Sequence, residues 1–332
     1  RAYGPGPSGA VSPPPTTGRR CGWRCPSAPA WSGRVRVCRG RPGRRADGDS
    51  FDRMLANYES PRGNPRFIHA LVELLQRELG WNIGPGNIAV TCGGQTACFY
   101  LFNLLGGQFA NGRRRRILLP LAPENIGYAD QGLEPDLFVS CQPRIEWPAG
   151  QGSHVFKYRI DFHAVEDVLR RGDIGAIAVS RPTNPTGNVV SDDEVRRLSG
   201  LAANHGIPLI LDNAYGAPFP DILFVQARPY WEPHVILTLS LSKLGLPGAR
   251  TGIVIAPEQI ASAISSLTAV VGLANATLGQ QLVLPWIEDG SILQLGARIL
   301  RPFYQEKSRA AMGWAREAFA ATGVNWAIHA SE

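Results

Sequence analysis

Lysine is the residue type that singles out a candidate reactive site in this sequence. The chain has only three, Lys157, Lys243 and Lys307, among 34 basic residues. An amine can lose its proton and attack a carbonyl, whereas a guanidinium keeps its charge. Lys157 and Lys307 lie in polar stretches and are expected to be solvated charges. Lys243 directly follows an apolar run, so it is the candidate nucleophile.

The residues around Lys243 add groups that could bind a phosphate. Residues 240–250 read SLSKLGLPGAR and bring two hydroxyls, Ser240 and Ser242, and the guanidinium of Arg250 into one Gly-containing turn. This set suits a cofactor that forms an imine with an amine and also carries a phosphate.

Three upstream segments carry polar or small residues directly after apolar runs. Residues 208–211 run into Asp212, with Tyr215 three positions further on, and residues 182–187 place Asn184 in a Pro-containing turn. Each of these is common turn chemistry by itself, but their joint occurrence in this order is more specific. Gly93, Gly94 and Gln95 connect a strand to a helix.

The elements that must position these residues alternate between strand and helix. Apolar strands are expected at residues 87–91, 117–119, 137–139, 174–179, 208–211, 235–239 and 252–255, with helices at 67–79, 97–105 and 191–205. This pattern predicts an α/β fold with a mainly parallel sheet flanked by helices, whose ligands lie at the carboxyl ends of the strands. Beyond Pro257 we expect one helical segment to Asp289, another to Thr322, and a new strand at 325–329.

On these segments the sequence resembles the class I/II, fold-type I aminotransferases, which use pyridoxal 5′-phosphate. The segments that match are residues 79–83, 99–104, 126–130, 180–189, 212–220 and 240–250. The resemblance extends from about Asp52 to the end of the chain. It implies a cofactor-binding large domain over residues 51–290 and the start of an incomplete C-terminal small domain over 291–332. Weaker, scattered matches favour members that exchange an amino group between valine or alanine and a 2-oxo acid, pyruvate or 2-oxoisovalerate.

The resemblance implies a role for each candidate residue. Lys243 would form the Schiff base with the cofactor and then move a proton, and Asp212 would pair with the pyridine nitrogen. Tyr215 and Asn184 would bond the ring's phenolic oxygen. The phosphate would be held by Arg250, Ser240, Ser242 and the backbone amides of Gly93, Gly94 and Gln95.

The resemblance also implies a homodimer with shared active sites, because Tyr58 matches a tyrosine that reaches the phosphate of the partner subunit. The family places its ring-stacking aromatic where this chain has Asn125, three positions before Tyr128. Relatives also have a Gly-rich apolar segment before the matched region and a C-terminal part with the arginine that binds the substrate carboxylate. We find no counterpart of either, so we expect a chain that binds the cofactor but transaminates poorly, and the sequence leaves the side-chain preference open.

The net charge of +7 belongs to the first fifty residues alone. They hold ten Arg, no Lys and two acids, which gives +8 there and leaves −1 for residues 51–332. A basic arm for nucleic acid and a targeting peptide are alternatives. The segment is rich in Arg, Pro and Gly and has no helical or strand period, so we expect it to be disordered or non-native. Nucleic acid is therefore not the expected partner of this chain.

Two other functions remain open on the same residues. One is a different reaction of the same cofactor, such as C–S lysis or decarboxylation, and the other is a non-catalytic regulator with a DNA-binding arm.

Cys21 and Cys25 lack a second pair at zinc-finger spacing, so no metal site is predicted. Cys92, Cys98 and Cys141 lie in apolar stretches and are expected to be buried free thiols. The cytoplasm is the expected compartment, and no membrane partner is expected because no run of apolar residues is long enough to span one.

Overall fold

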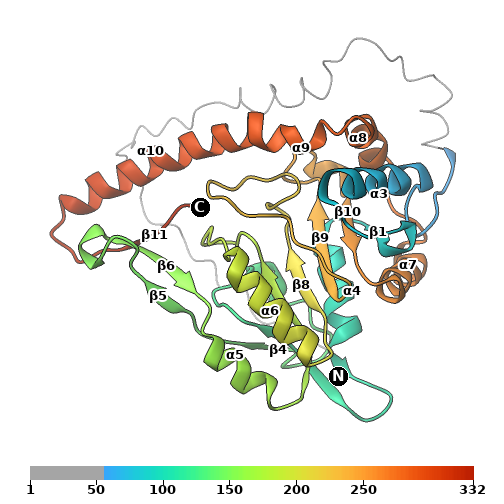
Figure 1. The fold of residues 1–332 in the computed structure, drawn as a ribbon, viewed down its shortest axis with the longest axis horizontal. Helices are drawn as coiled ribbons and strands as arrows, with labels where there is room; N and C mark the ends of the chain where they lie inside the picture. Colours follow the sequence, from blue (N-terminus) through green and yellow to red (C-terminus); the bar gives the residue numbers. More distant parts are fainter. Residues whose placement is uncertain (1–55) are drawn as a thin grey trace, which may run out of the picture. The chain divides into compact units, whose positions relative to one another are not determined.

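The computed structural model describes residues 56–332, and the basic segment 1–50 lies outside this range. The main feature is an eight-stranded sheet in the order β1-β10-β9-β8-β7-β3-β2, with β4 paired to β3 (Figure 1). Strands β4, β3, β7, β8 and β9 are parallel, whereas β10 runs antiparallel to both neighbours and β2 antiparallel to β3. The strands are β1 (Ile88–Thr91), β2 (Gly107–Gln108), β3 (Arg114–Leu119), β4 (Phe138–Ser140), β7 (Ile174–Ser180), β8 (Leu209–Asp212), β9 (Val235–Ser240) and β10 (Gly252–Ile255). The predicted α/β fold with a mainly parallel sheet is confirmed.

Helices cover both faces of this sheet. One apolar core contains Leu209 and Leu211 of β8 and packs against α3 (Pro65–Leu79), α5 (Phe162–Leu169), α6 (Asp192–Asn204) and α8 (Leu278–Glu288). The other contains Ile210 and packs against α4 (Gly94–Leu105) and α7 (Glu258–Gly272). Successive strand residues therefore face opposite layers, which explains why these strands read as continuous apolar runs.

The ends of the helices follow from short local signals. Asn64 accepts a hydrogen bond from the backbone of Phe67 and Pro65 opens α3, while Gly80 ends it in the left-handed conformation. Ser191 and Glu194 form the predicted capping box of α6. Short 3-10 turns lie at Pro85–Asn87, Ile126–Tyr128, Gln151–Ser153 and Pro247–Ala249.

Two helix predictions need correction. Helix α4 begins at Gly94 rather than residue 97, which brings its N-terminus to the end of β1. The single segment expected from Pro257 to Asp289 is two helices, α7 and α8, separated at Leu273 with a positive φ of 64°. Asn275 lies in this break and donates to the carbonyls of Val90 (2.7 Å) and Pro61 (3.0 Å), so side-chain bonds to β1 and its approach hold the interruption.

A second, three-stranded sheet joins residues far apart in the sequence. It consists of β5 (Arg144–Glu146), β6 (Val155–Arg159) and β11 (Ile328–His329), with β11 parallel to β6. The chain reaches β11 after α9 (Ile292–Leu295), a π turn (Gly296–Leu300) and the long α10 (Arg301–Ala320) (Figure 1). A strand is thus present within the predicted range 325–329, but it is limited to Ile328–His329. Across residues 56–332, none of the helices combines the length and apolar character needed to cross a membrane.

Candidate active site

A cavity of about 310 Å³ lies where β7, β8 and β9 end. The predicted residues that line it are Gly94, Gln95, Asn184, Asp212, Tyr215, Ser240, Ser242, Lys243 and Arg250. Four further residues, which were not among the predicted site residues, complete the lining: Cys98, Asn125, Tyr128 and Ala214. The carboxyl ends of parallel strands thus bring together segments spread over about half of the chain.

Asp212 is the buried anion of this cavity. It ends β8 and is 7% exposed. Its Oδ2 accepts a hydrogen bond from the hydroxyl of Tyr128 at 2.6 Å and a longer contact from the thiol of Cys98 at 3.8 Å. Its Oδ1 accepts from the hydroxyl of Thr238 and the backbone amide of Ala214, both at 3.0 Å. The carboxylate is therefore oriented by donors from four segments.

Burial and the charge of Asp212 keep two of these donors protonated. Burial raises the pKa of the Tyr128 hydroxyl well above its ordinary value, and Asp212 adds to the shift. Burial likewise raises the pKa of the Cys98 thiol, again with a contribution from Asp212. Both groups therefore act as hydrogen-bond donors to the carboxylate and do not compete with it as anions.

The opposite wall offers an anion site. Helix α4 begins without a side-chain cap, so the backbone N–H groups of its first turn, at Gly94 and Gln95, are available to bind an anion. Gly93 precedes them at φ +92°, and a Cβ built there would lie 2.2 Å from Nη2 of Arg250. Arg250 also contacts the carbonyl of Cys92 (3.4 Å) and Oγ of Ser242 (3.5 Å). The guanidinium thus packs over a helix N-terminus, and only glycine leaves it room.

Lys243 and Asn184 are presented by turns that follow β9 and β7. The Nζ of Lys243 lies 4.8 Å from the centroid of the Tyr215 ring. Asn184 lies in a turn closed by backbone hydrogen bonds from Thr183 to Asn188 (2.9 Å) and from Gly187 to Thr183 (2.7 Å). Both side chains therefore reach the cavity from the edge of the sheet at which Asp212 ends β8.

Two of the eleven predicted residues do not line the cavity. Gly93 lies behind Arg250, and the side chain of Tyr58 is 83% exposed.

Two expectations about other residues were wrong. Lys157 is buried at 6% exposure rather than solvated, because its ammonium is paired with Glu332. Cys92 is exposed, because it follows the last residue of β1, where the chain turns into α4.

Sequence signals could have found some of the additional residues that contact Asp212. Cys98 is four positions after Gly94, so helical spacing places both on the same face of α4. Thr238 is the register partner of Asp212 across the β8–β9 pair. The sequence assigned Tyr128 no role, because the family's stacking aromatic falls at Asn125. The structure instead places its ring edge-to-face with Phe102, at 5.0 Å between centroids, and its hydroxyl on Asp212.

The family assignment follows from comparison with known proteins. The sequence profile described as "Aminotransferase class I and II" matches residues 144–322, more than half of the chain. The chain belongs to the class I and II aminotransferases. The resemblance recognised in the sequence is therefore confirmed.

Individual aminotransferases are also similar to the chain. It is 50% identical over 254 residues to a protein of Escherichia coli (strain K12) named valine–pyruvate aminotransferase, covering 76% of this chain and 59% of that protein. A putative amino-acid aminotransferase from Psychrobacter arcticum has a TM-score of 0.83 at 41% identity, covering 91% of this chain and 70% of that one. A valine–pyruvate aminotransferase from Salmonella typhimurium has a TM-score of 0.72 at 43% identity, covering 82% of this chain and 66% of that one. The chain spans between half and three-fifths of the length of the first curated relatives it matches.

Proposed function

We propose that this chain binds pyridoxal 5′-phosphate and belongs to a transaminase that moves an amino group between valine or alanine and a 2-oxo acid. The observation that carries this proposal is the cavity, which combines the amine of Lys243, the carboxylate of Asp212 and an anion site at Arg250 and the start of α4. The similarity in sequence to the Escherichia coli valine–pyruvate aminotransferase supports the choice of substrates, which are pyruvate and 2-oxoisovalerate on the oxo-acid side.

The groups in the cavity fit the cofactor chemically. Pyridoxal phosphate has a phosphate, a pyridine nitrogen, a phenolic oxygen and an aldehyde, and each has a counterpart in the lining. The space over Gly93 that a Cβ would fill is occupied by the guanidinium of Arg250, which leaves this cation at the N-terminus of α4. A cation beside free backbone N–H groups is suited to a phosphate dianion.

Each group in the cavity would act on one part of the cofactor. When bound, pyridoxal phosphate supplies an aldehyde for amines and a ring that accepts electrons from the substrate carbon. Asp212 would keep a proton on the ring nitrogen, and its bonds from Tyr128 and Thr238 would keep the carboxylate in position. Lys243 would attach the cofactor through Nζ and then move a proton as a general base and acid.

The remaining residues would bind and orient the cofactor. Asn184 and Tyr215 would donate hydrogen bonds to the phenolic oxygen. The phosphate would be bound by Arg250, Ser240, Ser242 and the backbone of Gly93, Gly94 and Gln95. Ser240 is buried and accepts a hydrogen bond from the backbone of Ser242 (3.2 Å), so one hydroxyl is already fixed beside the anion site.

The test of this function is spectroscopic and chemical. The chain incubated with pyridoxal phosphate and desalted should keep the absorbance band of a protein-bound imine, and borohydride should reduce that imine to a stable adduct on Lys243. Lys243→Ala should give no adduct, while Lys307→Ala, which changes an exposed lysine on α10, should behave as the unchanged chain. An adduct in Lys243→Ala, or its absence from the unchanged chain, would contradict the proposal.

A second assay tests the reaction. Transfer of the amino group from valine to pyruvate is measured as the alanine formed, and release of ammonia without an added oxo acid would indicate a lyase instead.

We also propose that the active form is a homodimer with the sites at the interface. Tyr58 is exposed and lies outside the lining of its own chain's cavity. Beside the approach to β1, the break between α7 and α8 exposes a patch of apolar side chains: Val270, Val271, Leu273, Leu278 and Leu282. A second copy covering this patch would remove it from water and bring Tyr58 of one subunit to the other. Sedimentation of the chain, with Val270→Asp as the variant expected to weaken association, tests this state.

The cytoplasm is the compartment we propose. Cys92, Cys98 and Cys141 are free thiols, and free thiols persist in a reducing compartment. Amino acids and 2-oxo acids are small, soluble substrates of such a compartment.

A further inference from the structure

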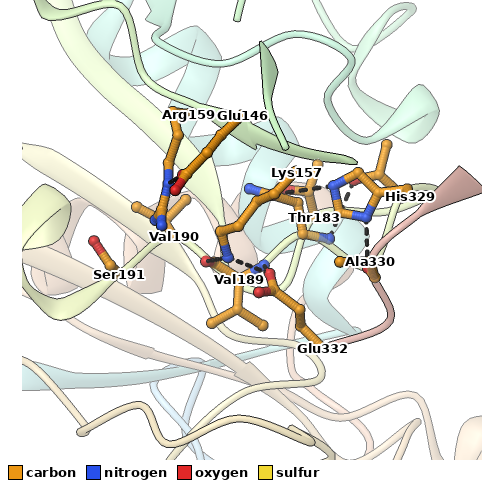
Figure 2. A network of polar contacts seen from close by, with 12 residues as sticks. Glu146, Lys157, Arg159, Thr183, Val189, Val190, Ser191, His329, Ala330 and Glu332 are labelled. Carbon is orange, nitrogen blue, oxygen red and sulfur yellow. Dashed lines mark hydrogen bonds and ion pairs between the residues drawn. The ribbon is translucent and has the colours of Figure 1, made fainter. Parts of the chain in front are cut away.

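The buried Lys157 of β6 and the carboxylate of Glu332 together bind the backbone of one residue, Val189 (Figure 2). Lys157 forms an ion pair with the carboxylate of Glu332, and both side chains are nearly buried, at 8% and 11% exposure. Nζ of Lys157 also donates to the carbonyl of Val189 at 2.9 Å, and Oε2 of Glu332 accepts from the amide of Val189 at 2.9 Å. The ion pair therefore binds both the N–H and the C=O of Val189.

The neighbouring residue is held from the same side. Nε2 of His329, on β11, lies 3.1 Å from Oδ1 of Asn188. β11 is fixed in turn on β6, since the amides of Ile328 and Ala330 donate to the carbonyls of His154 (2.9 Å) and Phe156 (2.8 Å). Residues 328–332 thus form a strap between β6 and the segment 188–189.

The segment 188–190 is one arm of the turn that presents Asn184 to the cavity. A further contact to this segment comes from Arg181, a buried residue at the start of the turn. Nε of Arg181 donates to the carbonyl of Val190 at 2.7 Å, and Nη2 pairs with Asp192 at 2.5 Å. Arg181 holds this arm at Val190, and the Lys157–Glu332 pair holds it at Val189. Asn184 lies in the part of the turn between Arg181 and Val189 and faces the cavity.

A buried ion pair is costly to assemble, because two charges lose their hydration. It stabilises a fold only where its remaining hydrogen-bonding capacity is used, and here that capacity is used on the N–H and C=O of one residue of the turn, Val189. An ion pair that contributed only to stability would not have to bind the backbone of Val189, which belongs to the turn of Asn184. The geometry therefore connects the C-terminal strap to the position of Asn184.

We propose that Lys157 and Glu332 are positioning residues, whose ion pair fixes the turn of Asn184 and thereby sets the hydrogen bond from Asn184 to the phenolic oxygen of the cofactor. The inference rests on the proposed function, because it assigns a role relative to bound pyridoxal phosphate. Neither residue lines the cavity, so each acts through the turn.

The readout is the pH at which the absorbance of the bound cofactor changes. A hydrogen bond to the phenolic oxygen favours its charged form, so weakening that bond should move the midpoint upward. Asn184→Ala removes the donor and should raise the midpoint by about one pH unit, and Lys157→Met should raise it by about half a unit. The double variant Lys157→Met/Asn184→Ala should show the shift of Asn184→Ala alone, because the position of a donor that is absent has no effect.

Two further variants separate positioning from stability. Lys157→Met leaves the carboxylate of Glu332 buried and unpaired, whereas Lys157→Met/Glu332→Gln also removes that charge and should recover much of the lost stability. The midpoint should stay shifted in this second variant, and amide hydrogen exchange of residues 183–190 in the cofactor-free chain should be faster in both. Lys307→Met, the substitution of an exposed lysine, is the matched control and should change neither readout.

The outcomes distinguish this inference from the proposed function. Absence of the borohydride adduct on Lys243 in the unchanged chain would overturn the function itself. If the adduct forms, an unchanged midpoint and unchanged exchange in the Lys157→Met/Glu332→Gln variant would overturn only the positioning role. Additive shifts in the double variant with Asn184→Ala would overturn it too, since they would show that the ion pair acts on the cofactor by another route.

Discussion

The hydroxyl of Tyr128 and the carboxylate of Asp212 form a hydrogen bond of 2.6 Å, and both residues are buried. Tyr128 lies in the 3-10 turn Ile126–Tyr128, on the connection that follows β3, and Asp212 ends β8. The bond therefore joins the end of β8 to the connection after β3, and β7 separates these two strands in the sheet. Because burial and the charge of Asp212 raise the pKa of the tyrosine, the proton stays on the phenol and the carboxylate keeps its capacity to accept.

Tyr128→Phe should weaken cofactor binding while the chain remains folded. The substitution keeps the ring that packs on Phe102 and removes only the donor to Oδ2. One hydrogen bond to a charged group contributes about 1.5 kcal/mol or more, so the dissociation constant for pyridoxal phosphate should rise about tenfold. The measurement is a titration followed by absorbance. Thr238→Val, which removes the donor to Oδ1, should have an effect in the same direction, and an unchanged constant in both variants would contradict the orienting role.

Gly93→Ala should disrupt the anion site. The added Cβ would lie 2.2 Å from Nη2 of Arg250, so the guanidinium must move, and the backbone φ of +92° adds strain of about 1–3 kcal/mol. We expect a lower melting temperature and a loss of affinity for pyridoxal phosphate of at least about tenfold.

Gly112→Ala is the matched control for this substitution. Gly112 also has a positive φ, +78°, but a Cβ there would meet nothing within 4 Å. It should therefore lower the melting temperature through backbone strain and leave cofactor affinity unchanged. If both variants lost the same affinity for pyridoxal phosphate, the loss would come from the lower stability of the fold and not from a displaced Arg250.

The parts of the site that could be predicted from the sequence are those that depend on local order. Asp212 ends the apolar strand β8 and Lys243 lies three residues after the end of β9, and the parallel arrangement of these strands brings their ends together. Helix signals such as the capping box at Ser191 are also local, and α6 begins as expected.

The parts that could not be predicted depend on partners that are distant in the sequence. Lys157 has the surroundings of a solvated lysine in the sequence, and its partner Glu332 is 175 residues away, brought to it by the pairing of β11 with β6. The break after α7 has its cause in Asn275, whose hydrogen bonds end on Pro61 and Val90. Helical periodicity contains no information about such bonds.

The buried carboxyl of Glu124 should make stability depend on pH. Burial raises its pKa from 4.5 to about 7, against the lowering effect of the hydrogen bonds from Ser180 and the backbone of Asn125. The folded chain therefore holds this proton up to about pH 7, while the unfolded chain loses it near 4.5. The stabilising contribution is complete below 4.5 and is lost as the pH rises to 7, by up to about 3 kcal/mol in the free energy of unfolding.

Glu124→Gln should remove this dependence, because the amide is neutral at every pH and similar in shape. Denaturant unfolding of the cofactor-free chain should show a smaller difference between acidic and mildly alkaline buffer in this variant than in the unchanged chain. Glu73→Gln, on the exposed face of α3, is the control and should leave the difference as it is. A Glu124→Gln chain with the full pH dependence would show that another group is responsible.

Mixed dimers should reveal whether Tyr58 acts on the partner's site. Tyr58→Ala should weaken cofactor binding and Lys243→Ala should abolish the borohydride adduct, so each variant alone is defective at low cofactor concentration. In a hybrid of the two, the chain with Tyr58→Ala keeps its Lys243 and receives the tyrosine from the other subunit. Differently tagged chains, coexpressed and isolated as hybrids, should therefore form the adduct at about half of their sites with unchanged affinity. Hybrids with the weak affinity of the Tyr58→Ala chain would place Tyr58, exposed in the single subunit, outside the shared site.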